Sequence, residues 1–388
     1  MSSLPPDPFG SESAAGGGGV PPQWAPQQSA GPGGSVPGGQ APWGSQEQWA
    51  GGLAPSSGGG KAKWVLGGLA VVLAIALAVV VTVLVVKPDT GTPAGPLNAG
   101  GDSSASEFAS ANDTGPITII TEDPSCAAWA PIQSTMADST EKNWGSRDPS
   151  IPASGWSPDQ RAQYEAVAQA MLNGAEQAKP LAKLTPHRVM RQLYEQFIAY
   201  TRAFADRVPT YTSSDDALAR TAITAAELIL NICEAAKFGS ASARAPLVPA
   251  VPTSDNAAQP QDPADPQRFL TSPNPTCPDW QTTTEKFRAD TADWEKTDPN
   301  IPVGQWSPEQ KSLNDEVATT MRESADALEA LGRRSDNPVV DDFAVLAAQY
   351  RRAYVAALPT YQRADKYLYK ASLYPTGIIL EACNAVTK

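Results

Sequence analysis

The sequence repeats itself once, at a spacing of about 150 residues, and this duplication constrains the fold more than any other feature. The register is kept over most of two long stretches, and tryptophans and cysteines anchor it. The clearest matches are Trp144 with Trp294, Asp148-Pro149 with Asp298-Pro299, Trp156-Ser157-Pro158 with Trp306-Ser307-Pro308, and Cys233 with Cys383; one residue of slippage aligns Cys126 with Cys277. Such self-similarity indicates a tandem duplication, so we expect two copies of one structural unit.

Each copy is predicted to be helical. In the first copy, apolar side chains recur with the 3.6-residue period of one helix face, from Val189 through Phe197 to Phe204. The expected helices of the first copy cover residues 126–142, 158–177, 186–207 and 215–236. In the second copy the second helix is expected to end at residue 331, and the third and fourth helices to cover residues 338–358 and 364–386. Four helices with short connections predict an all-α fold of two four-helix bundles in tandem.

The second helix of each copy carries a start signal. Ser157 precedes Pro158, and Gln160 stands three residues after the serine; Ser307 and Gln310 repeat the arrangement. Serine at the N-cap and glutamine at the third helical position form a capping box, in which each side chain bonds the other residue's backbone N–H. We expect both copies to use it.

The cysteines are predicted to staple each copy. Four cysteines allow three pairings, and each copy has one near its start and one near its end. In an up-down-up-down bundle these two ends meet, so the repeat favours Cys126–Cys233 and Cys277–Cys383 over crossed pairs. Each bridge would close a loop of about 107 residues, for which the chain-entropy estimate is on the order of 4–5 kcal/mol.

An uncharged run of apolar residues precedes the copies. Residues 64–86 would extend for roughly 34 Å as a helix, against about 30 Å for the hydrocarbon core of a bilayer. We therefore predict one transmembrane helix that is not cleaved. Lys61 and Lys63 before the run, and cysteines only after it, predict a plasma-membrane protein with a cytoplasmic N-terminus and extracytoplasmic C-terminal domains.

The remaining segments are rich in proline, glycine and serine. The predicted organisation is a disordered Pro/Gly/Gln-rich cytoplasmic arm (1–60), the transmembrane helix (64–86), a spacer (88–116), repeat 1 (117–238), a Pro-rich extended linker (239–273) and repeat 2 (274–388). Trp24, Trp43 and Trp49 interrupt the first segment. They are either incidental or contacts for a cytoplasmic partner.

Composition excludes several classes of function. The formal net charge of −12 argues against a nucleic-acid partner. The single histidine, His187, excludes a multi-histidine metal site, and no nucleotide-binding or hydrolase motif is present. Acidic pairs such as Asp215-Asp216 and Asp341-Asp342 stand at helix starts, where acids are expected. We predict no catalytic residue, no metal and no cofactor.

Aromatic residues are the candidates for binding. The loop between the first two helices of each copy holds Trp144 and Trp156, or Trp294 and Trp306. These indoles either cap the bundle or form a platform for a glycan, peptide or protein partner. Three tyrosines of the second copy have no aromatic counterpart in the first, which makes them further candidates: Tyr367, Tyr369 and Tyr374.

The layout resembles that of actinobacterial, mycobacterial-type, conserved membrane proteins of unassigned function. The resemblance lies in the Pro/Gly-rich N-terminal segment with sparse tryptophan, the single predicted span and the Ala-rich C-terminal part. It implies a cell-envelope setting. The expected function is non-catalytic binding or scaffolding with an envelope protein or glycan partner. The alternatives are a sensor or carrier that holds a small or lipidic ligand within a bundle, and an envelope glycan hydrolase.

Overall fold

The computed structural model describes residues 107–140, 144–252 and 257–387, and these residues contain helices and no strand. The all-helical prediction is therefore confirmed for this part of the chain. Repeat 1 holds α2 (Cys126–Thr140), α3 (Pro158–Leu184), α4 (Arg188–Arg207) and α5 (Asp216–Lys237). Repeat 2 holds α7 (Cys277–Thr291), α8 (Pro308–Arg334), α9 (Pro338–Ala357) and α10 (Lys366–Val386), and the short α6 (Ser240–Arg244) lies between the repeats.

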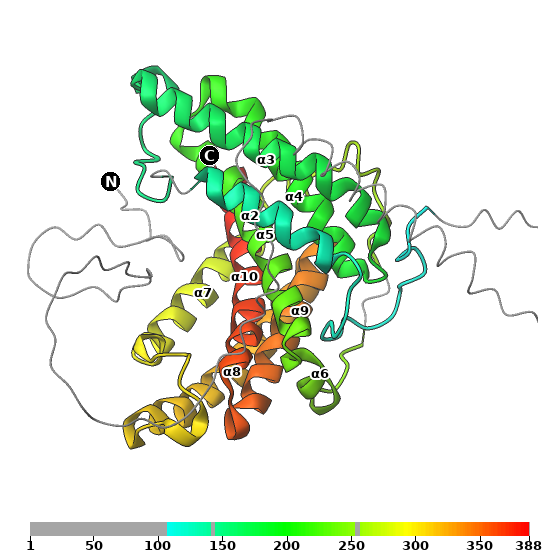
Figure 1. Cartoon of the computed structure of the whole chain (residues 1–388), viewed down its shortest axis with the longest axis vertical. Helices are drawn as coiled ribbons and strands as arrows, with labels where there is room; N and C mark the ends of the chain where they lie inside the picture. The colour runs from blue at the N-terminus through cyan, green and yellow to red at the C-terminus, as the bar shows by residue number, and fades with distance from the viewer. Residues whose placement is uncertain (1–106, 141–143, 253–256, 388) are drawn as a thin grey trace, which may run out of the picture. The chain divides into compact units, whose positions relative to one another are not determined.

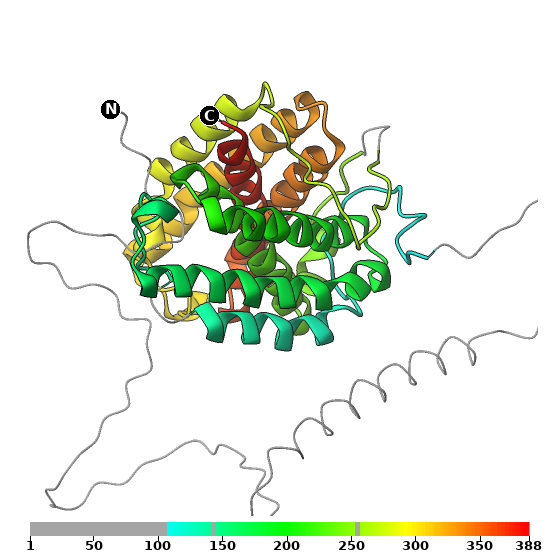
Figure 2. The same cartoon turned by 90° about the horizontal axis from the view of Figure 1, so that it is seen from above.

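The four helices of each repeat pack in a ring. In repeat 1, α3 packs on α2 and α4, and α5 closes the ring against α4 and α2; α7 to α10 follow the same order. Figure 2 shows α2, in teal, beside α3, in green. The two predicted disulfides are present: Cys126 is bonded to Cys233, with the Cα atoms 5.3 Å apart, and Cys277 to Cys383, with the Cα atoms 5.6 Å apart. Each bridge joins the first helix of its repeat to the fourth.

The structure agrees more closely with the predicted first residues of the helices than with their predicted last residues. Ser157 and Gln160 form the complete capping box. In repeat 2 only half of it forms, because the Gln310 side chain donates to the Asp298 carbonyl (3.4 Å) while Ser307 still caps the Gln310 N–H (3.1 Å). The helix expected to end at residue 177 continues to Leu184 with Pro180 inside it.

The two repeats share one hydrophobic core. The principal contact between them is α5 against α10, which are neighbours in Figure 1. Arg220 near the start of α5 bonds Glu381 near the end of α10 (2.8 Å), and Phe238 just after α5 stacks on Tyr367 at the start of α10. The two helices therefore run antiparallel, as in an isologous dimer interface, where equivalent elements of two copies face each other.

Two extended segments cross between the repeats; we name them arm 1 (108–125) and arm 2 (257–275). Arm 1 leads into repeat 1 but contacts α9 of repeat 2, where the Ile120 N–H donates to the Tyr350 hydroxyl (3.2 Å). Arm 2 leads into repeat 2 but contacts α4 of repeat 1, where the Tyr200 hydroxyl donates to the Leu270 carbonyl (3.4 Å). Tyr200 and Tyr350 are equivalent positions, so the exchange is reciprocal.

The structure corrects the predicted localisation, which was the plasma membrane with extracytoplasmic C-terminal domains. Across residues 107–140, 144–252 and 257–387, no helix has both the length and the apolar character needed to cross a membrane. The predicted span at 64–86, the segment 1–60 and Trp24, Trp43 and Trp49 lie outside the described residues.

Candidate functional site

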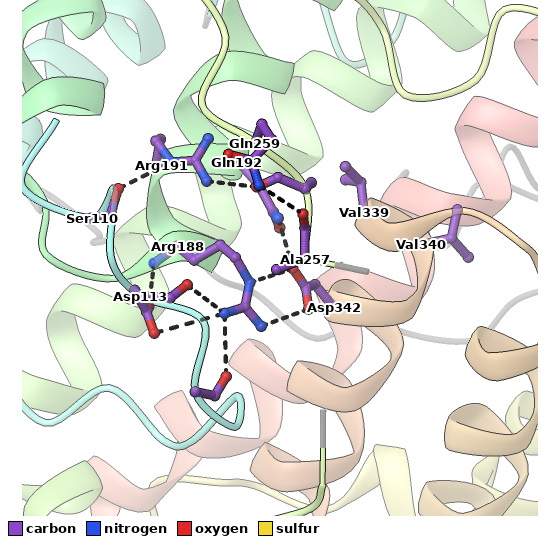
Figure 3. A network of polar contacts seen from close by, with 12 residues as sticks. Ser110, Asp113, Arg188, Arg191, Gln192, Ala257, Gln259, Val339, Val340 and Asp342 are labelled. Carbon is purple, nitrogen blue, oxygen red and sulfur yellow. Dashed lines mark hydrogen bonds and ion pairs between the residues drawn. The ribbon is translucent and has the colours of Figure 1, made fainter. Parts of the chain in front are cut away.

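A buried polar network joins the repeats where α4 and α9 begin (Figure 3). The Arg188 guanidinium, 2% exposed, donates from Nε to Asp342 Oδ2 (2.9 Å) and from Nη2 to Asp342 Oδ1 (3.1 Å). Gln192 donates to the same carboxylate (2.7 Å). Because Gln192 and Asp342 are equivalent positions of the two repeats, the local two-fold axis that relates them passes between their side chains.

The same guanidinium holds arm 1 in place. Arg188 Nη1 donates to the carbonyls of Asp113 (2.6 Å) and Gly115 (3.2 Å), and the Asp113 carboxylate accepts the Arg188 backbone N–H (2.6 Å). Figure 3 shows Arg188 between Asp113 on one side and Asp342 on the other. A charge so deeply buried is stable only when it is paired and hydrogen-bonded. The Arg188 guanidinium makes four hydrogen bonds, two of them to the Asp342 carboxylate.

A second buried pair on α4 holds arm 2. Arg191 bonds Glu195 (3.0 Å), and both side chains are about 1% exposed. Arg191 also donates to the Ala258 carbonyl (3.0 Å), while Glu195 accepts the Gln261 N–H (3.0 Å). Burial raises the pKa of Glu195, although the Arg191 charge opposes the shift. The Arg191–Glu195 pair therefore hydrogen-bonds to the backbone of arm 2, and this use of its polar atoms does not indicate a site for a free ligand.

A pocket of about 240 Å³ lies between arm 1 and the start of α4. Asp113, Thr118 and His187 supply its polar wall, and Ile117, Ile120 and Val189 its apolar wall. The His187 Nε2 atom lies 3.0 Å from the Glu122 carbonyl. Because the pocket lies under an arm and not between bundle helices, it lends no support to a carrier that encloses a lipid within a bundle.

The predicted tryptophan platform is largely buried. Trp144, Trp156 and Trp294 are each less than 10% exposed, and Trp306 is half-buried. The loops fold back because Trp156 and Trp306 donate to the carbonyls of Ile151 and Ile301 at 2.9 Å, five residues earlier in each repeat. These indoles pack inside the molecule, as the capping interpretation expects.

The three candidate tyrosines separate into different environments. Tyr369 packs against Trp294 with ring centroids 4.8 Å apart and donates to Glu295 (2.7 Å). Tyr374 is half-buried, and burial raises its pKa. Tyr367 stacks on Phe238 at 5.5 Å with the ring planes 8° apart, and Phe238 is 51% exposed. Of the three, Tyr367 belongs to an accessible aromatic pair.

The candidate acidic pairs are occupied by arginines. Asp342 pairs with Arg188 and Asp341 with Arg333 (3.4 Å), while Asp216 bonds Arg147. A two-carboxylate hydrolase needs one free acid and one free base, and these pairs supply neither. Within the described part of the chain, no group of three or more His, Cys, Asp or Glu side chains is placed to hold a metal ion.

Arg188, Asp342 and Phe238 were not predicted as site residues from the sequence, in which Asp342 was noted only as part of an acidic pair at a helix start. The first two are partners separated by 154 residues, and their equivalents, Pro338 and Gln192, carry no charge, so the repeat gave no signal. Phe238 did carry one: an aromatic residue directly before Gly239, which has a positive φ of 76°, marks an exposed helix end.

Comparison with known proteins gives two matches. The family described as mycobacterial ESX-1 associated protein matches residues 108–387. An uncharacterized protein of Mycolicibacterium smegmatis strain MKD8 is 47% identical over 341 residues, which are 88% of this chain and 90% of that protein. No solved structure matches the chain. The mycobacterial part of the predicted resemblance is thereby confirmed.

Proposed function

The chain belongs to the family of mycobacterial ESX-1 associated proteins, and on that premise we propose that it is a non-catalytic binding protein that works with the ESX-1 secretion machinery. The family match over residues 108–387 is the observation that carries this proposal. The matched region includes both repeats, both arms and the buried polar network, so the whole double unit is the proposed working part.

The side-chain chemistry supports a binding role over a catalytic one. The carboxylates that could act as acid or base at the helix starts are held by arginines. The buried Arg188 and Arg191 side chains bond backbone atoms of the two arms, and Arg188 also bonds Asp342 of the other repeat. Such a network stabilises one rigid surface, which is what a protein-binding scaffold needs.

Cross-linking in cells tests the proposal. The full chain with a C-terminal affinity tag is expressed in M. smegmatis, cross-linked in intact cells and purified under denaturing conditions. We expect ESX-1 components to be enriched over an untagged control, and over a control strain without the ESX-1 locus in which the same tagged chain is expressed. Enrichment of no ESX-1 component in the intact strain would contradict the proposed function.

A secretion assay adds a second readout. Deletion of the gene for the M. smegmatis relative is expected to reduce export of ESX-1 substrates, and the full chain should restore it. If deletion and complementation leave export unchanged, the chain does not work with this machinery.

A further inference from the structure

An accessible patch lies where the end of α5 meets the start of α10; we call it the seam patch. Its centre is the stacked pair Phe238 and Tyr367, contributed by different repeats. Phe238 and Leu247 are the large apolar side chains that are mostly exposed in the part of the chain that is described. Two cations lie over the rings, with Lys237 Nζ 5.2 Å from the Phe238 centroid and Lys366 Nζ 5.4 Å from the Tyr367 centroid. The charges of Arg363 and Lys370 are near enough to act on Lys366.

The cations lie where helix electrostatics disfavours them. Lys366 is the first residue of α10 and Lys370 lies one turn further on, although the N-terminus of a helix carries partial positive charge. The equivalent start of α5 follows the opposite rule, because Asp215 and Asp216 stand there. The helix dipole therefore gives no reason for the basic start of α10.

Few acids neutralise this group. Glu234 pairs with Lys237 (3.2 Å), Asp298 lies near enough to act on Lys366, and Glu227 lies near enough to interact with Lys370. Across the described ranges, no carboxylate lies within ion-pair distance of Arg363, Lys366 or Lys370, and Lys366 instead bonds the Asn300 side chain (3.0 Å). Burial lowers the pKa of Lys366, and the charges of Lys370 and Arg363 lower it further. The cations are thus held close together on a chain whose net charge is −12.

We propose that the seam patch binds an acidic polypeptide segment that inserts an aromatic or prolyl side chain against Phe238 and Tyr367, and that a component of the ESX-1 machinery presents this segment. The proposal rests on the function proposed above. An apolar anchor covers the exposed ring faces, while acidic neighbours of the anchor meet Arg363, Lys366 and Lys370.

A polypeptide fits this patch better than a continuous anionic surface does. The two rings are nearly parallel and are fixed by two different repeats, so they present one small site of defined shape. Glu234 and Asp298 lie beside the cations and would repel a uniformly negative surface, whereas a segment with spaced acids avoids them.

Site-specific photo-cross-linking locates the partner. Benzoylphenylalanine replaces Phe238 in the full tagged chain expressed in M. smegmatis, and a second variant carries it at Leu247, which is equally accessible at 58% exposure. We expect position 238 to capture an ESX-1 component and the cross-linked peptide to lie in a segment of net negative charge. Capture through a neutral or basic segment, or equal capture at position 247, would overturn the proposal.

Charge reversal tests the electrostatic part. The variant R363E/K370E changes two exposed cations of the patch, and K286E/K311E changes two exposed lysines elsewhere. We expect capture at position 238 to fall about fivefold or more in the first variant and by less than about twofold in the second. Circular dichroism confirms that both variants are folded, and an equal loss in both would contradict a specific patch.

The outcomes separate the two proposals. If tagged protein enriches ESX-1 components but position 238 captures none of them, the seam patch is wrong and the proposed function stands. If no ESX-1 component is captured by any variant, the proposed function fails. Purified full chain is also mixed with vesicles of phosphatidylglycerol or phosphatidylcholine. Binding to phosphatidylglycerol alone that R363E/K370E abolishes, without capture of a protein in cells, would assign the patch to an anionic lipid surface instead.

Discussion

Repeat 1 and repeat 2 have the same helix order and an equivalent disulfide, yet α4 and α9 carry different side chains where the repeats meet. On α4 of repeat 1, Arg188, Arg191 and Glu195 are buried and bond the backbones of both arms. The equivalent positions on α9 are Pro338, Asp341 and Val345, of which only the aspartate is charged. The two repeats have thus kept the same helix packing, while the side chains near the local two-fold axis have diverged. The Arg188–Asp342 pair, which we call the lock, therefore occurs once and not twice.

The hydrogen bonding of equivalent buried polar groups also differs between the two repeats. Trp129 of repeat 1 donates to the Ala226 carbonyl (3.3 Å), but its counterpart Trp280 has no hydrogen-bond partner within the described residues. The hydroxyls of Thr284 and Thr376 are also buried without a partner there. The opposite holds at another pair of equivalent positions, because Trp144 Nε1 of repeat 1 has no partner within the described residues while Trp294 of repeat 2 donates to Asn314 (3.0 Å). Neither repeat is therefore better satisfied throughout, and the following experiments compare the two position by position.

The largest effect is expected at the lock. Arg188→Met leaves the Asp342 carboxylate buried without its cation, which should lower the free energy of unfolding by about 3–5 kcal/mol. The measurement is urea unfolding of the full chain followed by circular dichroism. Arg334→Met is the control, because Arg334 and its partner Asp279 are both more than half exposed and the pair should contribute about 0–1 kcal/mol.

The double variant R188M/D342L sharpens this result. Because it removes both charges, it should recover much of the loss. If R188M is no more destabilising than R334M, the buried pair does not lock the repeats.

The disulfides come next. The two bridges close loops of almost equal length, with sequence separations of 107 and 106, so C126S/C233S and C277S/C383S should each cost about 2–4 kcal/mol. Melting of each variant under non-reducing conditions measures the loss. Since the two loops are almost equal in length, any difference in melting temperature between the variants arises from the other interactions within each repeat. A bridge whose removal leaves the melting temperature unchanged would contradict its predicted role as a staple.

A smaller effect is expected at the buried polar positions. Gln133→Leu in repeat 1 breaks a hydrogen bond to Glu227 (2.8 Å) and should cost about 1 kcal/mol. Thr284→Val at the equivalent position of repeat 2 removes a hydroxyl without a partner, so stability should stay the same or rise by up to about 1 kcal/mol. Equal losses in the two variants would show that the side chains at positions 133 and 284 contribute equally to stability.

The smallest effect is a change in pH dependence. Burial raises the pKa of Glu227, against the opposing effects of Gln133 and Lys370. A carboxyl whose pKa is higher in the folded than in the unfolded chain binds its proton more readily when folded. Its contribution therefore makes the free energy of unfolding rise as the pH falls through the folded pKa towards the unfolded value.

Glu227→Gln should flatten this rise, and urea midpoints across the acidic range measure it. Glu316→Gln, on the exposed side of α8, makes the same change in net charge. If both variants flatten the profile equally, net charge and not the buried carboxyl is responsible.

Local signals in the sequence predicted the helices and the disulfides well. The 3.6-residue period of α4, the serine caps and the cysteine placement depend on near neighbours or on the duplication itself. The end of α3 was misjudged because Pro180 is tolerated inside the helix. In repeat 2, Gln310 bonds the Asp298 carbonyl in place of the backbone N–H of Ser307, and no propensity distinguishes the two choices.

The site was harder to predict because its chemistry depends on pairs that are distant in sequence. Arg188 meets Asp342, and Phe238 meets Tyr367, only after the repeats dock. The tyrosine candidates of repeat 2 did include Tyr367, since the comparison between the copies singles it out. Phe238 shows the same kind of asymmetry, since Lys388 stands at its equivalent position, but it was not singled out. Only one half of the pair was therefore predicted.

The reciprocal crossing of the arms has a consequence for biosynthesis. Ile120 bonds Tyr350, which lies 230 residues later, so the first half leaves the ribosome while the face that will receive its leading segment is still untranslated. At roughly 5–20 residues per second, synthesis of that interval takes on the order of ten seconds or more. The nascent repeat 1 must therefore avoid aggregation through its exposed apolar side chains until α9 and α10 have been synthesised. A chain that ends before these helices could not complete the fold.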